Sequence, residues 1–84
     1  YLPKVYPNPF NPALNIKLSA KAGLELKLDI FSCIGRFITN LYNDKMKSDL
    51  QSFSWNPKNI PSGIFFVRSK INGTYSFRKV TYIK

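Results

Sequence analysis

Residues 24–30 read Leu-Glu-Leu-Lys-Leu-Asp-Ile, so apolar and charged side chains alternate along the whole stretch. Successive side chains of a β-strand point to opposite faces, and this alternation predicts a strand with one face in a core and one in solvent. Residues 14–18 show the same period of two, with aliphatic side chains on either side of Asn15 and Lys17. No segment shows the period of about 3.6 residues that marks an amphipathic helix. The chain is therefore predicted to be all-β.

Two acidic residues share the polar face of this strand. Glu25 and Asp29 lie four positions apart, which on a strand is roughly 13 Å at ~3.3 Å per residue. That separation is too large for paired-carboxylate chemistry. We therefore expect both side chains to be solvated charges.

Turn signals and shorter apolar runs predict the other strands. Gly35 closes a hairpin loop over residues 32–35, because glycine adopts the positive φ that other residues resist. Asn72-Gly73 predicts a type I′ hairpin turn for the same reason. The remaining strands are expected at 36–42, at 50–55 with Trp55 in the core, at 64–67 in a central position, and at 74–83, with a polar surface loop at 43–49. Six or seven short strands predict a small antiparallel β-sandwich of immunoglobulin-like arrangement.

Residues 1–12 form a proline-rich segment ahead of the first predicted strand. It holds four of the six prolines, and proline fixes φ near −65° and removes a backbone donor. A helix is excluded and a central strand is disfavoured. We expect an ordered, irregular segment whose Val5, Tyr6 and Phe10 pack onto the edge of the domain.

Length and composition restrict the chemistry. The 84 residues suffice for a single domain over 1–84, and a 44% apolar share is too high for a disordered basic tail. The chain has no histidine and one cysteine, Cys33. It therefore offers no histidine-based acid–base chemistry, no cluster of zinc ligands and no internal disulfide. We expect a protein without catalytic activity, cofactor or metal.

The chain is strongly basic, with 13 Lys and Arg residues against 4 Asp and Glu residues and a formal net charge of +9. The basic residues are scattered in runs no longer than two, whereas a nucleic-acid footprint clusters on one element. We expect most of this charge to serve solubility, and we expect no nucleic-acid partner. No run of ~18 apolar residues predicts a membrane span. Because the chain begins with Tyr1 rather than Met, we expect a piece of a larger protein.

Five segments resemble the motifs of a known family in order and spacing. They are Tyr-Pro-Asn-Pro-Phe-Asn-Pro at 6–12, Ile-Phe-Ser-Cys-Ile-Gly-Arg at 30–36, Trp-Asn at 55–56, Ile-Pro-Ser-Gly-Ile-Phe-Phe-Val-Arg at 60–68 and Arg-Lys-Val-Thr-Tyr-Ile-Lys at 78–84. The pattern resembles the C-terminal sorting domains of the type IX secretion system and the related immunoglobulin-like domain of the flagellar hook-capping protein FlgD. Three residues depart from it. Ser32 replaces Asp or Asn and weakens a turn cap, Phe65 replaces Tyr, and Ser69 replaces a hydrophobe.

This resemblance implies a non-catalytic sorting module of an exported bacterial protein. Such domains are recognised by the outer-membrane translocation machinery, which sends the protein from the periplasm to the cell surface or outside. They are often removed afterwards. The implied partners are that machinery and the upstream domains of the parent protein, the isolated domain is expected to be monomeric, and Lys84 is expected to be the native C-terminus.

The candidate recognition residues come from the resembling motifs and the basic C-terminal end. They are Pro7, Asn8, Pro9, Gly35, Gly63, Phe65, Lys79 and Lys84. The last strand is expected to leave one edge unpaired, and unpaired backbone groups can bind a partner. Simpler interpretations stay open: the prolines as a rigid cap, the glycines as backbone geometry, and the lysines as solubilising charges. A second function class also stays open, a FlgD-like structural or adhesive module for protein assembly or glycan contact.

Overall fold

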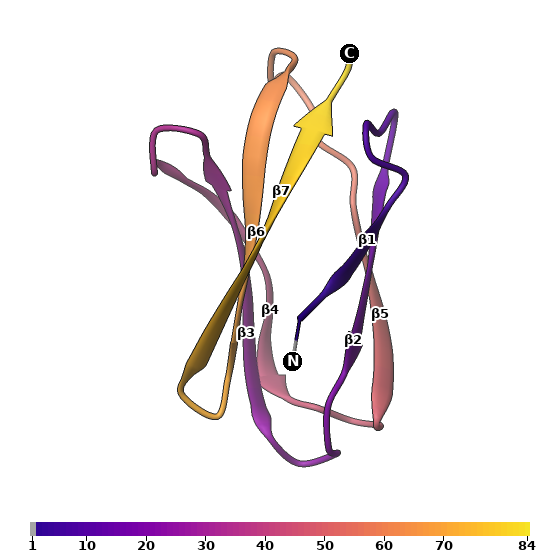
Figure 1. Ribbon diagram of the computed structural model, residues 1–84, viewed down its shortest axis with the longest axis vertical. Helices are drawn as coiled ribbons and strands as arrows, with labels where there is room; N and C mark the ends of the chain where they lie inside the picture. The colour runs from indigo at the N-terminus through magenta and orange to yellow at the C-terminus, as the bar shows by residue number, and fades with distance from the viewer. Residues whose placement is uncertain (1) are drawn as a thin grey trace.

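The computed structural model describes residues 2–84, which form two stacked antiparallel β-sheets (Figure 1). One sheet has the strand order β1-β2-β5, with β1 (Lys4–Tyr6), β2 (Leu14–Ser19) and β5 (Leu50–Trp55). The other has the order β4-β3-β6-β7, with β3 (Glu25–Ser32), β4 (Phe37–Lys45), β6 (Gly63–Ile71) and β7 (Thr74–Tyr82). The predicted all-β sandwich is confirmed, with seven strands. Tyr1, the first residue of the predicted proline-rich segment, lies outside the described residues.

The core lies between the two sheets and follows the alternation of the sequence. β2 buries Leu14, Ile16 and Leu18 and exposes the residues between them. β3 and β6 face β2 and β5 with their own buried aliphatic residues, and each such side chain contributes about 1.5–3 kcal/mol to folding. Trp55 is buried as predicted, and its ring centroid lies 5.4 Å from that of Phe65.

Both predicted hairpin turns are present. Asn72 and Gly73 join β6 to β7 with φ values of 50° and 84°, as a type I′ turn requires. Gly35 has a φ of 84° in the β3–β4 turn, and its N–H donates to the Ser32 carbonyl at 2.9 Å. The Arg36 N–H donates to the Ser32 hydroxyl at 3.1 Å. Ser32 therefore still caps this turn, although the family pattern favours Asp or Asn there.

Two segments predicted to be irregular contain strand residues. Lys4–Tyr6 of the proline-rich segment forms β1, an edge strand paired with β2. The predicted loop at 43–49 is partly strand, because β4 extends to Lys45 and its residues 43–45 pair with Glu25–Lys27. These predictions were wrong because an edge strand can consist of polar, exposed residues as long as its backbone is paired on one side. The irregular alternation of β4 arises from two register shifts against β3, at Leu28/Asp29 and Ile30/Phe31.

The sequence predicted that Phe10 packs onto the edge of the domain. In the structure Phe10 lies in the core instead. It is 1% exposed, and its ring centroid lies 5.1 Å from Tyr82 and 5.6 Å from Trp55. The reason is that the chain leaves the first sheet after β1 and pairs with β7 of the second sheet at Phe10. The proline-rich segment thus contacts both sheets.

Candidate recognition surface

The proline-rich segment runs along the outer edge of β7. Phe10 forms a parallel bridge with Tyr82. Its N–H donates to the Thr81 carbonyl at 2.9 Å, and its carbonyl accepts from the Ile83 N–H at 3.2 Å. Two backbone hydrogen bonds therefore pair this segment with the last strand.

Asn8 adds two side-chain hydrogen bonds to the same edge. Its Nδ2 donates to the Lys79 carbonyl at 3.2 Å, and its Oδ1 accepts from the Thr81 N–H at 3.0 Å. Pro7 and Pro9 on either side have no N–H to donate. The Asn8 side-chain amide therefore supplies a donor and an acceptor to β7, as the N–H and C=O of a paired strand would. The peptide bonds that precede Pro7, Pro9 and Pro12 are cis.

These contacts change the prediction of an unpaired C-terminal edge. In an antiparallel strand, every second residue directs its N–H and C=O to the same side. At the end of β7 and just beyond it those residues are 79, 81 and 83, and the proline-rich segment covers them. By the same alternation Tyr75 and Phe77 direct their backbone groups outward, where no strand of residues 2–84 pairs with them. The free edge is therefore the first half of β7, away from Lys79 and Lys84.

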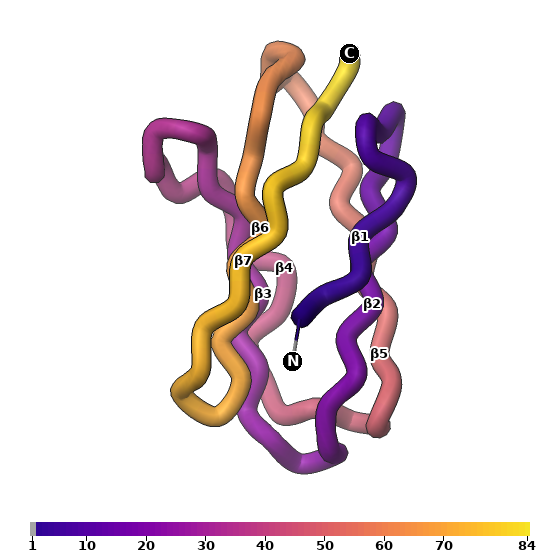
Figure 2. Tube along the Cα trace, in the orientation of Figure 1, coloured from indigo at the N-terminus to yellow at the C-terminus, as the bar shows by residue number. Residues whose placement is uncertain are grey.

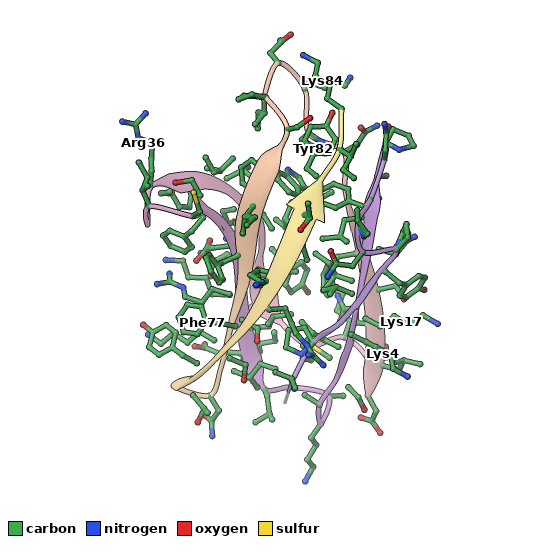
Figure 3. All side chains as sticks on the ribbon, turned by 45° about the horizontal axis from the view of Figure 1, so that its top comes forward. Lys4, Lys17, Arg36, Phe77, Tyr82 and Lys84 are labelled. Atoms are coloured by element: carbon green, nitrogen blue, oxygen red, sulfur yellow. The ribbon has the colours of Figure 1, made fainter. Side chains whose placement is uncertain are left out.

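The C-terminal end is held from its other side as well. The Lys84 N–H donates to the Ser62 hydroxyl at 2.7 Å, and Gly63 pairs with Tyr82 in the β6–β7 ladder. Figure 3 shows Tyr82 and Lys84 together at one end of the sandwich. Gly63 is not among the glycines with a positive φ, so the interpretation of the glycines as backbone geometry does not apply to it in that form. A Cβ there would meet Phe65 at a relaxed 4.0 Å.

Five of the predicted residues form one exposed surface, which we call the terminal surface: Pro7, Asn8, Pro9, Lys79 and Lys84. Gly63 lies beside it. Phe65 lies in the core, where a partner cannot reach it. Gly35 is at the tip of the β3–β4 hairpin, which projects sideways from the sandwich on the other side of β6 and β7 from the proline-rich segment (Figure 2). The structure therefore unites most of the predicted residues and separates Gly35 from them.

A buried ion pair on the outer face of the four-stranded sheet is the main feature that sequence reasoning missed. Asp29 is 1% exposed, and its Oδ2 lies 2.9 Å from Nη2 of Arg68. Asn40 Nδ2 donates to Asp29 Oδ1 at 2.8 Å. The expectation that Asp29 is solvated was wrong because aromatic side chains and Arg68 cover this face of β3. The outward-facing Ile64 and Phe66 of β6 were a signal that this face is not simply polar.

The described residues offer little for catalysis or metal binding. Residues 2–84 contain no group of three or more His, Cys, Asp or Glu side chains that could hold a metal ion. The buried carboxylate of Asp29 is engaged by Arg68 and Asn40, and the Cys33 thiol is free and exposed. No helix in this part of the chain is long and apolar enough to cross a membrane. The arrangement is suited to binding through its surfaces.

A family model described as "Secretion system C-terminal sorting domain" matches residues 4–84. The match includes the proline-rich contact with β7, both hairpins and the C-terminal strand. It confirms the resemblance seen in the five sequence motifs. A comparison with curated proteins found no match.

Proposed function

Since this match covers almost the whole chain, the protein belongs to the family of secretion system C-terminal sorting domains, and we propose that it is recognised as a folded, non-catalytic signal through its terminal surface. Domains of this family are sorting signals of type IX secretion, and they are in general not enzymes. They interact with the type IX machinery and mark proteins for export to the cell surface or outside.

The pairing of the proline-rich segment with β7 is the observation that supports the proposal. Asn8 and Thr81 lie 73 positions apart in the chain and are joined by a hydrogen bond. The terminal surface therefore exists only when the domain is folded. A receptor that binds it distinguishes a folded exported protein from an unfolded one, and no bond needs to be made or broken for that.

The charge of the chain supports a monomer. With a net charge of +9, two copies that approach each other repel. Lys79 and Lys84 add exposed positive charge at the terminal surface itself. We propose that the isolated domain, residues 1–84, is monomeric and that its receptor supplies acidic groups.

The test is an export assay with the full chain fused to the C-terminus of a periplasmic reporter enzyme. We expect the reporter at the cell surface or in the medium in a bacterium with a type IX system, and in the periplasm when that system is deleted. The double substitution Lys79→Gln and Lys84→Gln should reduce export severalfold. The matched control, Lys4→Gln with Lys17→Gln, removes the same charge from the three-stranded sheet. Export that is equally unaffected by both pairs would reject the terminal surface as the recognised site.

A further inference from the structure

The two outer faces of the sandwich differ strongly in composition. On the three-stranded sheet, the exposed positions of β2 and β5 are mostly polar: Asn15, Lys17, Ser19, Leu50, Ser52 and Ser54. On the four-stranded sheet, most of the outward positions from β3 to β7 are aromatic, aliphatic or basic. Solubility alone gives no reason for this asymmetry, because exposed apolar patches are costly unless they bind something.

A row of stacked side chains crosses the four-stranded face, with one residue from each strand. Phe37 of β4 meets Phe31 of β3 edge-on, with ring centroids 5.8 Å apart. The Arg68 guanidinium of β6 lies over the Phe31 ring at 4.5 Å and over the Tyr75 ring of β7 at 5.1 Å. We call these four residues the aromatic row. Phe37 is 54% exposed and Tyr75 is 49% exposed, so the row is open to a partner.

A shallow apolar pocket of about 380 Å³ lies beside the aromatic row. Its walls are Phe31, Phe66, Phe77, Arg68 and the β3–β4 hairpin. Its volume is at the lower end of the range for ligand pockets, which suits one apolar side chain of a partner. Phe77 is 56% exposed at the rim. Figure 3 shows Phe77 and Arg36 projecting on one side of the sandwich and Lys4 and Lys17 on the other.

The electrostatics of this face are basic at the rim and neutral in the middle. Arg68 is paired with Asp29, so neither charge is free. Arg36 and Lys79 lie at the hairpin end, and Lys27 and Lys70 lie at the other end. Glu25 and Asp44 also line the surface at that second end, together with Lys45. A complementary partner presents apolar side chains to the middle and carboxylates to the rim.

We propose that this face docks an extended segment of a partner protein in which apolar side chains alternate with Asp or Glu. The aromatic row crosses four strands, which at ~4.8 Å per strand spacing is roughly 14 Å, the length of an extended segment of about four residues. Alternation turns the apolar side chains toward the row and the pocket and the carboxylates away from the sheet, where the positive potential of the basic rim attracts them at longer range. A second copy of this chain does not fit, because a symmetric contact brings the two basic rims together.

This docking face meets the terminal surface at Lys79, which pairs with Phe66 and lies on the same outer face of the sheet as Phe77. It extends across the β4-β3-β6-β7 sheet, whereas the other residues of the terminal surface lie beyond the outer edge of β7 or at the C-terminal end. A peptide titration measures binding to this face directly, so its failure and a failure of the export test are distinguishable.

An NMR titration of the ¹⁵N-labelled chain with three short peptides tests the proposal. The first is acetyl-Asp-Phe-Asp-Phe-Asp-amide, the second has Lys in place of Asp, and the third has Ser in place of Phe. We expect the first to bind with millimolar affinity and to shift the amide signals of Phe31, Cys33 and Phe77. The second and third should bind at least about tenfold more weakly, a difference of about 1.4 kcal/mol. Absence of saturable shifts with the first peptide, or equal shifts with the Lys peptide, would overturn the proposal.

Substitutions locate the binding site on the chain. Phe77→Ser and Arg36→Glu should each weaken binding of the first peptide by about tenfold. The controls are Leu50→Ser, since Leu50 is 59% exposed on the other sheet, and Lys17→Glu. The amide spectrum itself reports whether each variant is folded, and Arg36→Glu changes no packed residue. Controls that lose affinity as much as the face variants would overturn the proposal.

Other occupants of the face give distinct results. Diffusion measurements that show a dimer lost on Phe77→Ser would replace the partner segment with a second copy of the chain. Tighter binding of this face to phosphatidylglycerol vesicles or to an oligonucleotide than to the acidic peptide would assign it to an anionic surface instead. Either result would overturn the proposal as stated.

Discussion

Asp29 is charged and almost completely buried, and its surroundings explain how the domain tolerates it. Removing a carboxylate from water costs several kcal/mol, which is offset only when both oxygens have strong partners. Arg68 pairs with one oxygen and Asn40 donates to the other. The rings of Phe31 and Tyr75 hold the guanidinium of Arg68 in place. The same residue therefore neutralises Asp29 and forms part of the aromatic row.

Replacing Arg68 should be strongly destabilising because it leaves the Asp29 charge without its cation. We expect Arg68→Met to lower the free energy of unfolding by about 3–5 kcal/mol. Asp29→Asn removes that charge, so the double variant should be more stable than additivity predicts, with a coupling energy of about 1–3 kcal/mol. Urea denaturation of the four proteins measures this cycle. Strictly additive effects would show that the ion pair contributes nothing specific.

Ser69 is a second buried polar residue, and its environment is less favourable. It is 1% exposed, and its hydroxyl is without a hydrogen-bond partner among the described residues. Ser69→Ala removes this unsatisfied group and should raise the free energy of unfolding by about 1 kcal/mol. Ser52→Ala, at an exposed position of β5, is the matched control and should change it little. A loss of stability in Ser69→Ala would mean that the hydroxyl has a partner after all.

At the scale of elements, the β6–β7 turn depends on glycine for backbone reasons only. Gly73 has a φ of 84°, and a Cβ there meets nothing within 4 Å. Gly73→Ala should therefore cost about 1–2 kcal/mol, the price of the left-handed conformation for an L-residue. Gly63→Ala is the control, because Gly63 is not in that conformation and has room for a Cβ. Thermal unfolding should show a lower midpoint for Gly73→Ala and little change for Gly63→Ala.

The strands themselves were largely predictable because their signals are local. Alternation in residues 14–18 and 24–30 specifies β2 and β3, and Asn72-Gly73 specifies the turn between β6 and β7. The burial of Asp29 was not predictable from alternation, since alternation separates the two faces of a strand without showing what covers each face. That cover comes from Arg68, which is 39 positions away in the chain.

The hydrogen bonds of Asn8 should control local opening at the end of β7. Asn8→Ala removes two of them and should lower the free energy of unfolding by about 1 kcal/mol, since both are exposed. The Thr81 amide should exchange its hydrogen faster, because it loses its acceptor, whereas the Val80 amide faces β6 and should be much less affected. Asn11→Ala is the control, an exposed asparagine in the same segment. Equal exchange at Thr81 in both variants would show that the Asn8 contact is not formed in solution.

At the scale of the whole molecule, the sequence identified most residues of the candidate site. It did not show that these residues lie next to one another. The motif at 6–12 and the basic end at 78–84 were each visible in the sequence. Their contact was not, because a pairing over more than 70 positions leaves no local pattern. The contact also explains why the proline-rich segment is part of the fold, since β1 pairs with one sheet and Phe10 with the other.

This role of Phe10 predicts that the whole domain depends on the segment. Replacing a buried phenylalanine by alanine costs about 3–5 kcal/mol, and a domain of 84 residues has a total of only about 4–13 kcal/mol. We expect Phe10→Ala to be partly or fully unfolded at 37 °C and Phe10→Leu to stay folded with a lower midpoint, as measured by circular dichroism. A chain shortened to begin at Ala13 should be unfolded because it loses β1 and Phe10 together. If Phe10→Ala kept the unfolding midpoint of the original chain, the proline-rich segment would be an appendage, and the terminal surface would not require a folded domain.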